Sequence, residues 1–257
     1  MSERRIQEAI SNGYEFKTNE YFNKSFNMIK ENGAFLILYA FVCFLISIFV
    51  GVLPFISLII NVFISFPLMV GFALGVHKYL KTRDSEFGDF FNGFDHVGPL
   101  AVLYLLNMLI ALFFLVPFFM ILFGSIISSG LIDTVQIEDV IENIITPFSI
   151  SMITVMIILG VYLSVSLRWA PYLVVFNKFQ PINALKTSFK LVNKNLFNQL
   201  IFLLLTVLII FGGAIAFLIG LFVALPIILV ADYFAFADVT GLNDETSEID
   251  DLGKDLV

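Results

Sequence analysis

The sequence predicts an all-α, polytopic membrane protein with six transmembrane helices. Hydrophobic residues make up 59% and charged residues 14% of its 257 positions, whereas soluble domains average about 25% charged residues. The mean hydropathy is +0.96. No charged side chain occurs from residue 32 to residue 76, and one membrane crossing needs only about 20 residues. That stretch therefore holds two spans.

The same length argument places six spans in the chain, arranged as three hairpins. We expect them at roughly 34–53, 55–79, 98–123, 147–176, 197–217 and 219–238. Lys and Arg occur before the first span, between the second and third, and around the connection from the fourth to the fifth. By the positive-inside rule, both termini are predicted to be cytoplasmic.

Each hairpin is expected to follow an amphipathic helix that lies in the cytoplasmic membrane interface. The first belongs to a cytoplasmic segment, 1–32, where Phe22, Phe26 and Ile29 share one face before a break at Asn32-Gly33. The second covers 84–95. The third begins at Pro181 and places one apolar stripe against three lysines: Ile182, Leu185, Phe189, Val192 and Leu196 against Lys186, Lys190 and Lys194. After the membrane domain, 33–240, we expect a mobile acidic tail at 241–257.

The three units are interpreted as a possible internal repeat. The octets SFNMIKEN, at 25–32, and SFKLVNKN, at 188–195, match at several positions, and each precedes a hairpin. The second arm of each hairpin contains a proline: Pro67, Pro171 and Pro226. Each proline is expected to kink its span, because a proline inside a helix removes a backbone donor.

Two stripes of small residues are candidates for close helix packing. Gly71 and Gly75 lie four residues apart in the second span, and the fifth span and its turn carry a similar series of Gly212, Ala216 and Gly220. Small side chains let membrane helices approach closely. A glycine-lined ligand path is the alternative for the first stripe.

Arg168 and Asp232 are the main candidates for a polar site, because ionisable groups are costly inside a membrane. Three interpretations are open. Arg168 extends to lipid phosphate beside an interfacial Trp169 while Asp232 reaches water; or the two charges form a structural ion pair; or they bind a substrate or a lipid headgroup.

The remaining signals argue against enzymatic chemistry. His77 and His96 lack a third metal ligand, and Cys43 is the only cysteine. No nucleophile-elbow, P-loop or zinc-protease motif is present. The net charge of −7 argues against nucleic acid as a partner. We therefore expect no cofactor, no metal and no catalytic residue.

The stretch with Arg168-Trp169, Pro171, Ala184-Leu185-Lys186, Ser188 and Asn195, together with the later Gly220, Pro226 and Tyr233, resembles a bacterial family of six-span membrane proteins. That family includes the membrane domain of some glycerophosphodiester phosphodiesterases and related uncharacterised families. The resemblance implies a multi-pass protein of the bacterial cytoplasmic membrane. The soluble phosphodiesterase domain is absent, so its activity is not implied, and Asn177 stands where relatives often carry an acidic residue.

Two functions follow as hypotheses. The first is a non-enzymatic integral membrane protein that organises lipid or a membrane complex, with membrane lipids as partners and a homo-oligomer or another membrane protein as further possible partners. The second is a transporter or lipid-handling protein that binds an anionic headgroup in a cytoplasm-facing cavity near Arg168. The second requires a polar cavity that Arg168 and Asp232 face, whereas the first lets them face lipid or each other.

Overall fold

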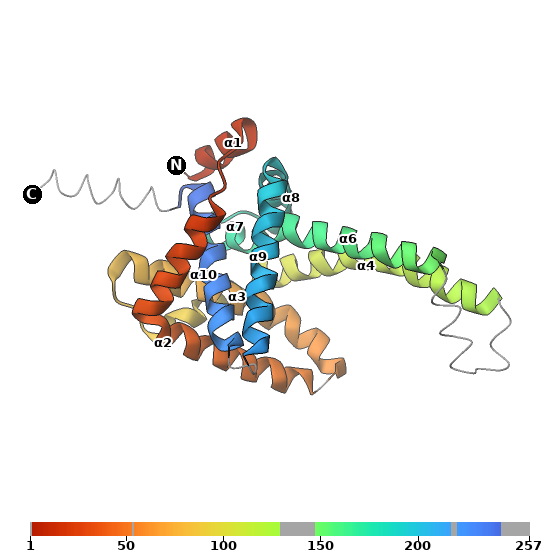
Figure 1. The fold of residues 1–257 in the computed structure, drawn as a ribbon, viewed down its shortest axis with the longest axis horizontal. Helices are drawn as coiled ribbons and strands as arrows, with labels where there is room; N and C mark the ends of the chain where they lie inside the picture. Colours follow the sequence, from red (N-terminus) through yellow and green to blue (C-terminus); the bar gives the residue numbers. More distant parts are fainter. Residues whose placement is uncertain (1, 53, 129–146, 217–219, 243–257) are drawn as a thin grey trace, which may run out of the picture. The chain divides into compact units, whose positions relative to one another are not determined.

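The computed structural model describes residues 2–52, 54–128, 147–216 and 220–242, and these residues form helices and no strand (Figure 1). The predicted all-α class is therefore confirmed. Most of the predicted acidic tail, from residue 243 on, lies outside the described residues. The elements are α1 (Ser2–Asn12), α2 (Thr18–Gly51), α3 (Pro54–Thr82), η1 (Phe87–His96), α4 (Val97–Ser128), α6 (Pro147–Leu167), α7 (Ala170–Phe176), α8 (Pro181–Lys194), α9 (Leu196–Ile215) and α10 (Leu221–Thr240).

Six helical stretches among the described residues are long and apolar enough to cross a membrane. Their positions agree with the six predicted spans, which confirms a multi-pass membrane protein. Large apolar side chains such as Phe49, Leu58 and Phe211 are exposed on them, as expected where lipid tails replace water. The spans are Gly33–Gly51, Ile56–Thr82, Phe87–Val116, Ile150–Phe176, Leu196–Ile215 and Leu221–Thr240.

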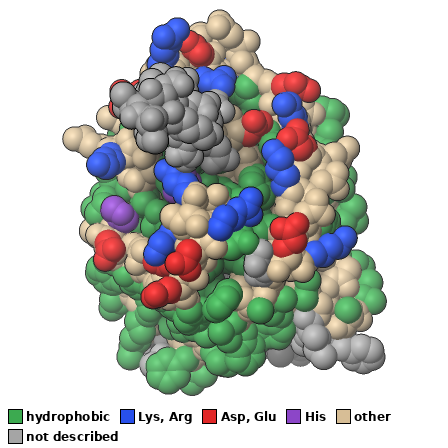
Figure 2. Space-filling model, turned by 90° about the vertical axis from the view of Figure 1, so that its left-hand side faces the viewer, with side chains coloured by type: hydrophobic (Ala, Val, Ile, Leu, Met, Phe, Trp, Pro, Cys, Tyr) green, Lys and Arg blue, Asp and Glu red, His purple; other side chains and the backbone are tan. Residues whose placement is uncertain are grey.

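The chain divides into two compact units. One contains the residues up to Tyr104 and those from Val165 onward; the other is Leu105–Ser164, which is most of α4 and α6. All contacts described below lie within the first unit. On the face drawn in Figure 2, charged side chains gather over the upper part and apolar side chains over the lower part.

The predicted break at Asn32-Gly33 is wrong, because α2 runs unbroken from Thr18 to Gly51. A glycine inside a helix costs only about 1 kcal/mol relative to alanine, and Gly33 is packed between Ile29 and Ile37. The buried face of the first half of α2 also differs from the predicted stripe. Phe26 is 39% exposed, and the buried face is formed by Tyr21, Phe22, Ser25 and Met28.

The helix predicted at 84–95 is present as η1, a 3₁₀ helix that packs along α3. At the contact, Gly71 of α3 faces the backbone of Phe90 and Gly93, and Gly93 faces the backbone of Pro67 and Gly71. Gly75 faces the ring of Phe90. The first small-residue stripe therefore accommodates η1.

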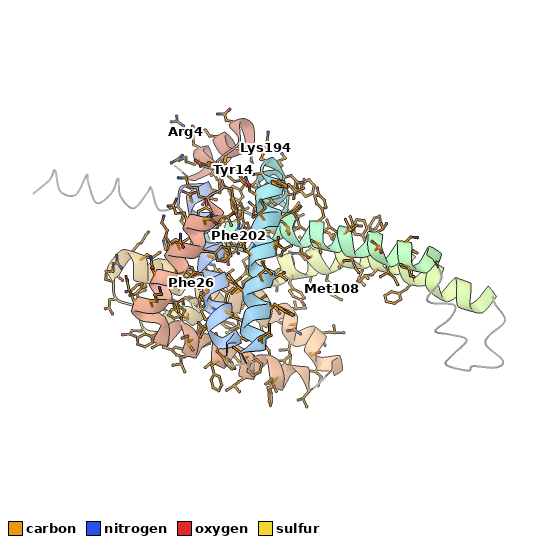
Figure 3. The ribbon with its side chains drawn as sticks, viewed as in Figure 1. Arg4, Tyr14, Phe26, Met108, Lys194 and Phe202 are labelled. Carbon is orange, nitrogen blue, oxygen red and sulfur yellow. The ribbon has the colours of Figure 1, made fainter. Side chains whose placement is uncertain are left out.

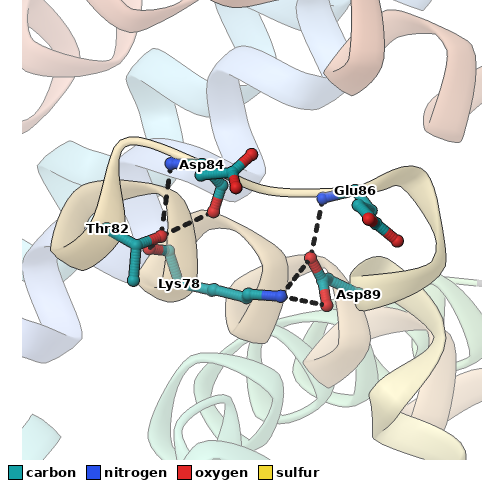
Figure 4. A network of polar contacts seen from close by, with 5 residues as sticks. All are labelled: Lys78, Thr82, Asp84, Glu86 and Asp89. Atoms are coloured by element: carbon teal, nitrogen blue, oxygen red, sulfur yellow. Dashed lines mark hydrogen bonds and ion pairs between the residues drawn. The ribbon is translucent and has the colours of Figure 1, made fainter.

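A polar turn folds η1 back onto α3 (Figure 4). The chain leaves α3 at Thr82 through Arg83, which has a left-handed φ of 55°. Asp89 then accepts two hydrogen bonds from Lys78 Nζ, at 2.7 and 2.8 Å, and one from the Glu86 backbone N–H at 2.7 Å. These bonds join the end of α3 to the first turn of η1.

The three prolines have different surroundings. Pro171 follows a real break, because α6 ends at Leu167 and α7 begins at Ala170. Pro171 occupies the first turn of α7, where a missing N–H costs nothing. Pro67 and Pro226 lie inside α3 and α10.

In the second small-residue stripe, the first residue at the contact is Gly213 and not the predicted Gly212. Gly213, and not Gly212, faces the backbone of Gly220, which in turn lies close to Ala216. A Cβ on Gly212 would meet nothing within 4 Å. Gly213, Ala216 and Gly220 therefore close the turn between α9 and α10.

The packing of the three elements that precede a hairpin follows one pattern. η1 packs on α3, α8 packs on α7, and α2 packs on α10. Each of the three elements therefore contacts the last helix of another copy of the predicted repeat. Two serines at matching positions of the repeated octets each donate to a backbone carbonyl. Ser25 Oγ donates to the Ile227 carbonyl, and Ser188 Oγ donates to the Ser166 carbonyl at 2.9 Å. Both serines are fully buried. The internal repeat remains a prediction.

Candidate functional site

The structure brings the three predicted site residues together. Arg168 and Trp169 form the break between α6 and α7, and Asp232 lies in α10. Arg168 Nη2 is 3.3 Å from Asp232 Oδ1, and each side chain is only 16% exposed. Of the three interpretations of these charges, the ion pair is the one that matches this geometry.

Trp169 is completely buried, so its interpretation as an interfacial anchor is wrong. Its indole Nε1 donates to Asp232 Oδ1 at 3.3 Å. The Arg168 guanidinium lies over the Trp169 ring at 5.0 Å and over the Phe202 ring at 4.6 Å. Cation–π contacts strengthen when they are shielded from water. Arg168 is therefore held inside the protein and does not extend to lipid phosphate.

The segment between α1 and α2 adds a polar network beside this pair. Tyr14 lies beside the start of α9, above Phe202 (Figure 3). Its hydroxyl donates to the Leu191 carbonyl at 2.9 Å and accepts from Gln199 Nε2 at 3.0 Å. Asn195 Nδ2 donates to the Tyr14 carbonyl at 2.9 Å. The N-terminal segment is thus tied to the junction of α8 and α9.

Sequence reasoning missed Tyr14 and Gln199 as members of the site. Gln199 is fully buried. Its position as a polar side chain inside an apolar span is the sequence signal that could have identified it. Tyr14 stands in the loop between α1 and α2, so the helical spacing that groups it with Ile6 and Ile10 does not predict its contacts with α8 and α9.

Some polar atoms of the site have no hydrogen-bond partner among the described residues: Nε and Nη2 of Arg168 and Oε1 of Gln199. The Arg168–Asp232 contact is accordingly an ion pair without hydrogen-bond geometry. Buried polar atoms that remain unpaired are costly. A water molecule could pair with any of these atoms, whereas an anionic group could pair only with the two donor nitrogens of Arg168.

Burial raises the pKa of the Tyr14 phenol to about 12, and the hydrogen bond from Gln199 only partly offsets this effect. Below pH 10 the phenol is protonated in both the folded and the unfolded chain, so the stabilising contribution is fully present. Between pH 10 and about 12 the unfolded chain ionises first, and the contribution is lost.

We therefore expect the free energy of unfolding to fall by about 2–3 kcal/mol through this group as the pH rises from 10 to 12. Unfolding would be followed at several pH values in detergent. The Tyr14→Phe variant should lose less stability over this interval than the wild type. Equal losses in both proteins would show that Tyr14 is not the titrating group.

His77 contacts two other helices inside the protein. Its Nδ1 lies 2.5 Å from the Tyr233 hydroxyl, and its ring packs edge-on against Phe176. Within the part of the chain that the structure describes, no three His, Cys, Asp or Glu side chains are placed to hold a metal ion. His77 therefore connects α3 to α10.

No protein-family model, curated protein or solved structure matches the chain at a significant level. The resemblance to the membrane domain of glycerophosphodiester phosphodiesterases thus remains a prediction.

Proposed function

We propose that this protein is a non-enzymatic integral membrane protein that organises anionic lipid at the cytoplasmic surface of a bacterial membrane. The observation that supports this proposal is that the two mostly buried charges pair with each other inside the protein. Arg168 and Asp232 face each other, and Trp169, Phe202 and the Tyr14 network surround them. Such a cluster fixes the α6–α7 break against α10, as a structural protein requires.

The outer face of α8 supports a role toward lipid. Ala184, Ser188 and Leu191 are buried, whereas Ile182 and Phe189 are 55% and 39% exposed. The exposed Lys186, Lys190 and Lys194 continue this outer face. An apolar edge beside a row of lysines is typical of a helix that lies at the surface of an anionic membrane.

The double change Lys186→Gln, Lys190→Gln is expected to lower the preference for phosphatidylglycerol over phosphatidylcholine by about 5- to 25-fold. A lysine near an anionic surface contributes about 1 kcal/mol, and neither lysine forms an ion pair with a described residue. Native mass spectrometry of the protein with both lipids would measure the ratio retained at low and high salt.

The matched control is Lys17→Gln, Lys24→Gln on α2. These lysines are 4.0 and 2.7 Å from Glu20, and they lower the pKa of that carboxyl, so one of their two charges is already compensated. Their loss should change the lipid preference little. A similar effect of both double changes, or no preference in the wild type, would contradict the proposal.

A second candidate, binding of an anionic headgroup at Arg168, is favoured by one observation. Two guanidinium nitrogens of Arg168 donate no hydrogen bond to a described residue. In the same mass-spectrometry experiment this function predicts one phosphatidylglycerol that survives the Lys186 and Lys190 changes and disappears in Arg168→Gln. Lipid that depends on the two lysines alone would favour the first function.

A further inference from the structure

A cavity of about 430 Å³ lies between the first hairpin and α10, and Arg168 is not among the residues that line it. Its volume falls within the range of about 300–1,000 Å³ that is typical of small-molecule sites. Its walls are mostly apolar. The first hairpin contributes residues from Tyr39 to Val50 and from Asn61 to Met69, and the rest come from Ile210, Leu225, Ile228 and Leu229.

The cavity has a buried floor and an exposed rim. Tyr39, Ala40 and Val50 are almost completely buried, whereas Phe44, Ile210 and Leu225 are each more than one-third exposed. These residues lie in membrane-spanning stretches. The rim therefore opens toward the surface that lipid tails cover, and a molecule of the bilayer can enter from the side.

One polar group in the wall has an unused donor. Ser65 Oγ donates to Asn61 Oδ1 at 3.2 Å, whereas the Asn61 amide nitrogen donates to no described residue. The other hydroxyls are occupied, since Ser47 donates to the Cys43 carbonyl and Tyr39 to the Leu68 carbonyl, both at 2.8 Å. A donor inside a membrane gains most from an acceptor that an apolar ligand carries with it.

We propose that this cavity binds a linear hydrocarbon chain that ends in a carbonyl group, with the chain along the apolar wall and the carbonyl oxygen accepting from Asn61 Nδ2. Both a free fatty acid and the acyl ester of a phospholipid have this chemistry. The site goes beyond the function proposed above and stands without it, because it contains none of the lysines of α8.

Native mass spectrometry of the full chain, with palmitic acid and dipalmitoyl phosphatidylglycerol as separate probes, tests the proposal. One probe molecule is expected to bind per protein, saturably. The added mass identifies the ligand. Binding of palmitic acid alone indicates a site for a free fatty acid. Binding of the phospholipid alone, or competition between the two probes, indicates a site for the acyl chain of a phospholipid. Absence of saturable binding of either probe would overturn it.

Two substitutions on α2 separate the cavity from the surrounding lipid. Cys43→Phe places a ring in the cavity and should weaken binding at least tenfold. Leu45→Phe adds a ring two residues away, at an exposed side chain outside the cavity lining, and should leave binding unchanged. Equal binding by both variants would assign the bound lipid to the outer surface and overturn the proposal.

The wild-type thiol gives a second readout that needs no bulky change. Cys43 is the only cysteine of the chain, so N-ethylmaleimide labels one position in this wall. Palmitic acid should slow the labelling, and Asn61→Leu should raise the palmitic acid concentration needed by about fivefold, as expected for one lost hydrogen bond. Labelling that palmitic acid does not slow would contradict occupancy of the cavity.

Discussion

Replacing Arg168 with leucine is expected to lower the free energy of unfolding by about 3–5 kcal/mol. Removal of one partner from a buried ion pair leaves the other charge uncompensated, and Asp232 would keep only neutral donors such as the Trp169 N–H. Trp169 is the only tryptophan of the chain. Its fluorescence therefore reports the state of this site directly during thermal or denaturant unfolding in detergent.

Two control variants test whether the loss of stability comes from the buried ion pair. The double change Arg168→Leu, Asp232→Leu should recover much of the loss, because apolar residues of similar size often replace a buried pair without cost. Lys78→Gln breaks the ion pair with Asp89, where the lysine is 46% exposed, and should cost much less, as is usual for exposed pairs. If Arg168→Leu costs no more than Lys78→Gln, the pair does not stabilise the fold.

The cost of charge in a membrane singled out Arg168 and Asp232 from the sequence, but it did not determine their contact. That contact depends on α10 lying against the α6–α7 break, and no local pattern encodes it. Trp169 shows the same limit. A tryptophan at a span end is typical of the membrane interface, yet here Phe16 and Phe236 pack around it, with ring centroids 6.3 and 6.1 Å away.

The amphipathic helices account for the remaining differences between the faces predicted from the sequence and the faces buried in the structure. Periodicity indicates which residues share a face, but it does not decide whether lipid or protein covers that face. Ser25 and Ser188 are buried, whereas the neighbouring Phe26 and Phe189 are exposed. In a membrane protein, helix contacts favour small and hydrogen-bonding side chains and lipid accepts the large apolar ones. A stripe chosen by hydrophobicity alone therefore mixes the two sides. Of the predicted stripes, Phe22, Leu185 and Val192 are buried, whereas Phe26, Ile182 and Phe189 are exposed.

Replacing Gly93 with alanine is expected to separate η1 from α3 and to cost about 3 kcal/mol. A Cβ at this position would collide with the Pro67 carbonyl and the backbone of Gly71. Neither neighbour can rotate away, because both are backbone atoms of a spanning helix. Unfolding followed by Trp169 fluorescence gives the stability, and hydrogen exchange of the η1 amides shows whether this element detaches first.

Gly88→Ala is the matched control, since Gly88 lies in the same element and a Cβ there would meet nothing within 4 Å. Its effect should stay within about 0.5 kcal/mol, as is usual for surface positions. Gly71→Ala, on the other side of the contact, should resemble Gly93→Ala because its Cβ would meet the Phe90 carbonyl. Equal stability of the Gly88 and Gly93 variants would mean that η1 does not pack on α3 as closely as the backbone contact requires.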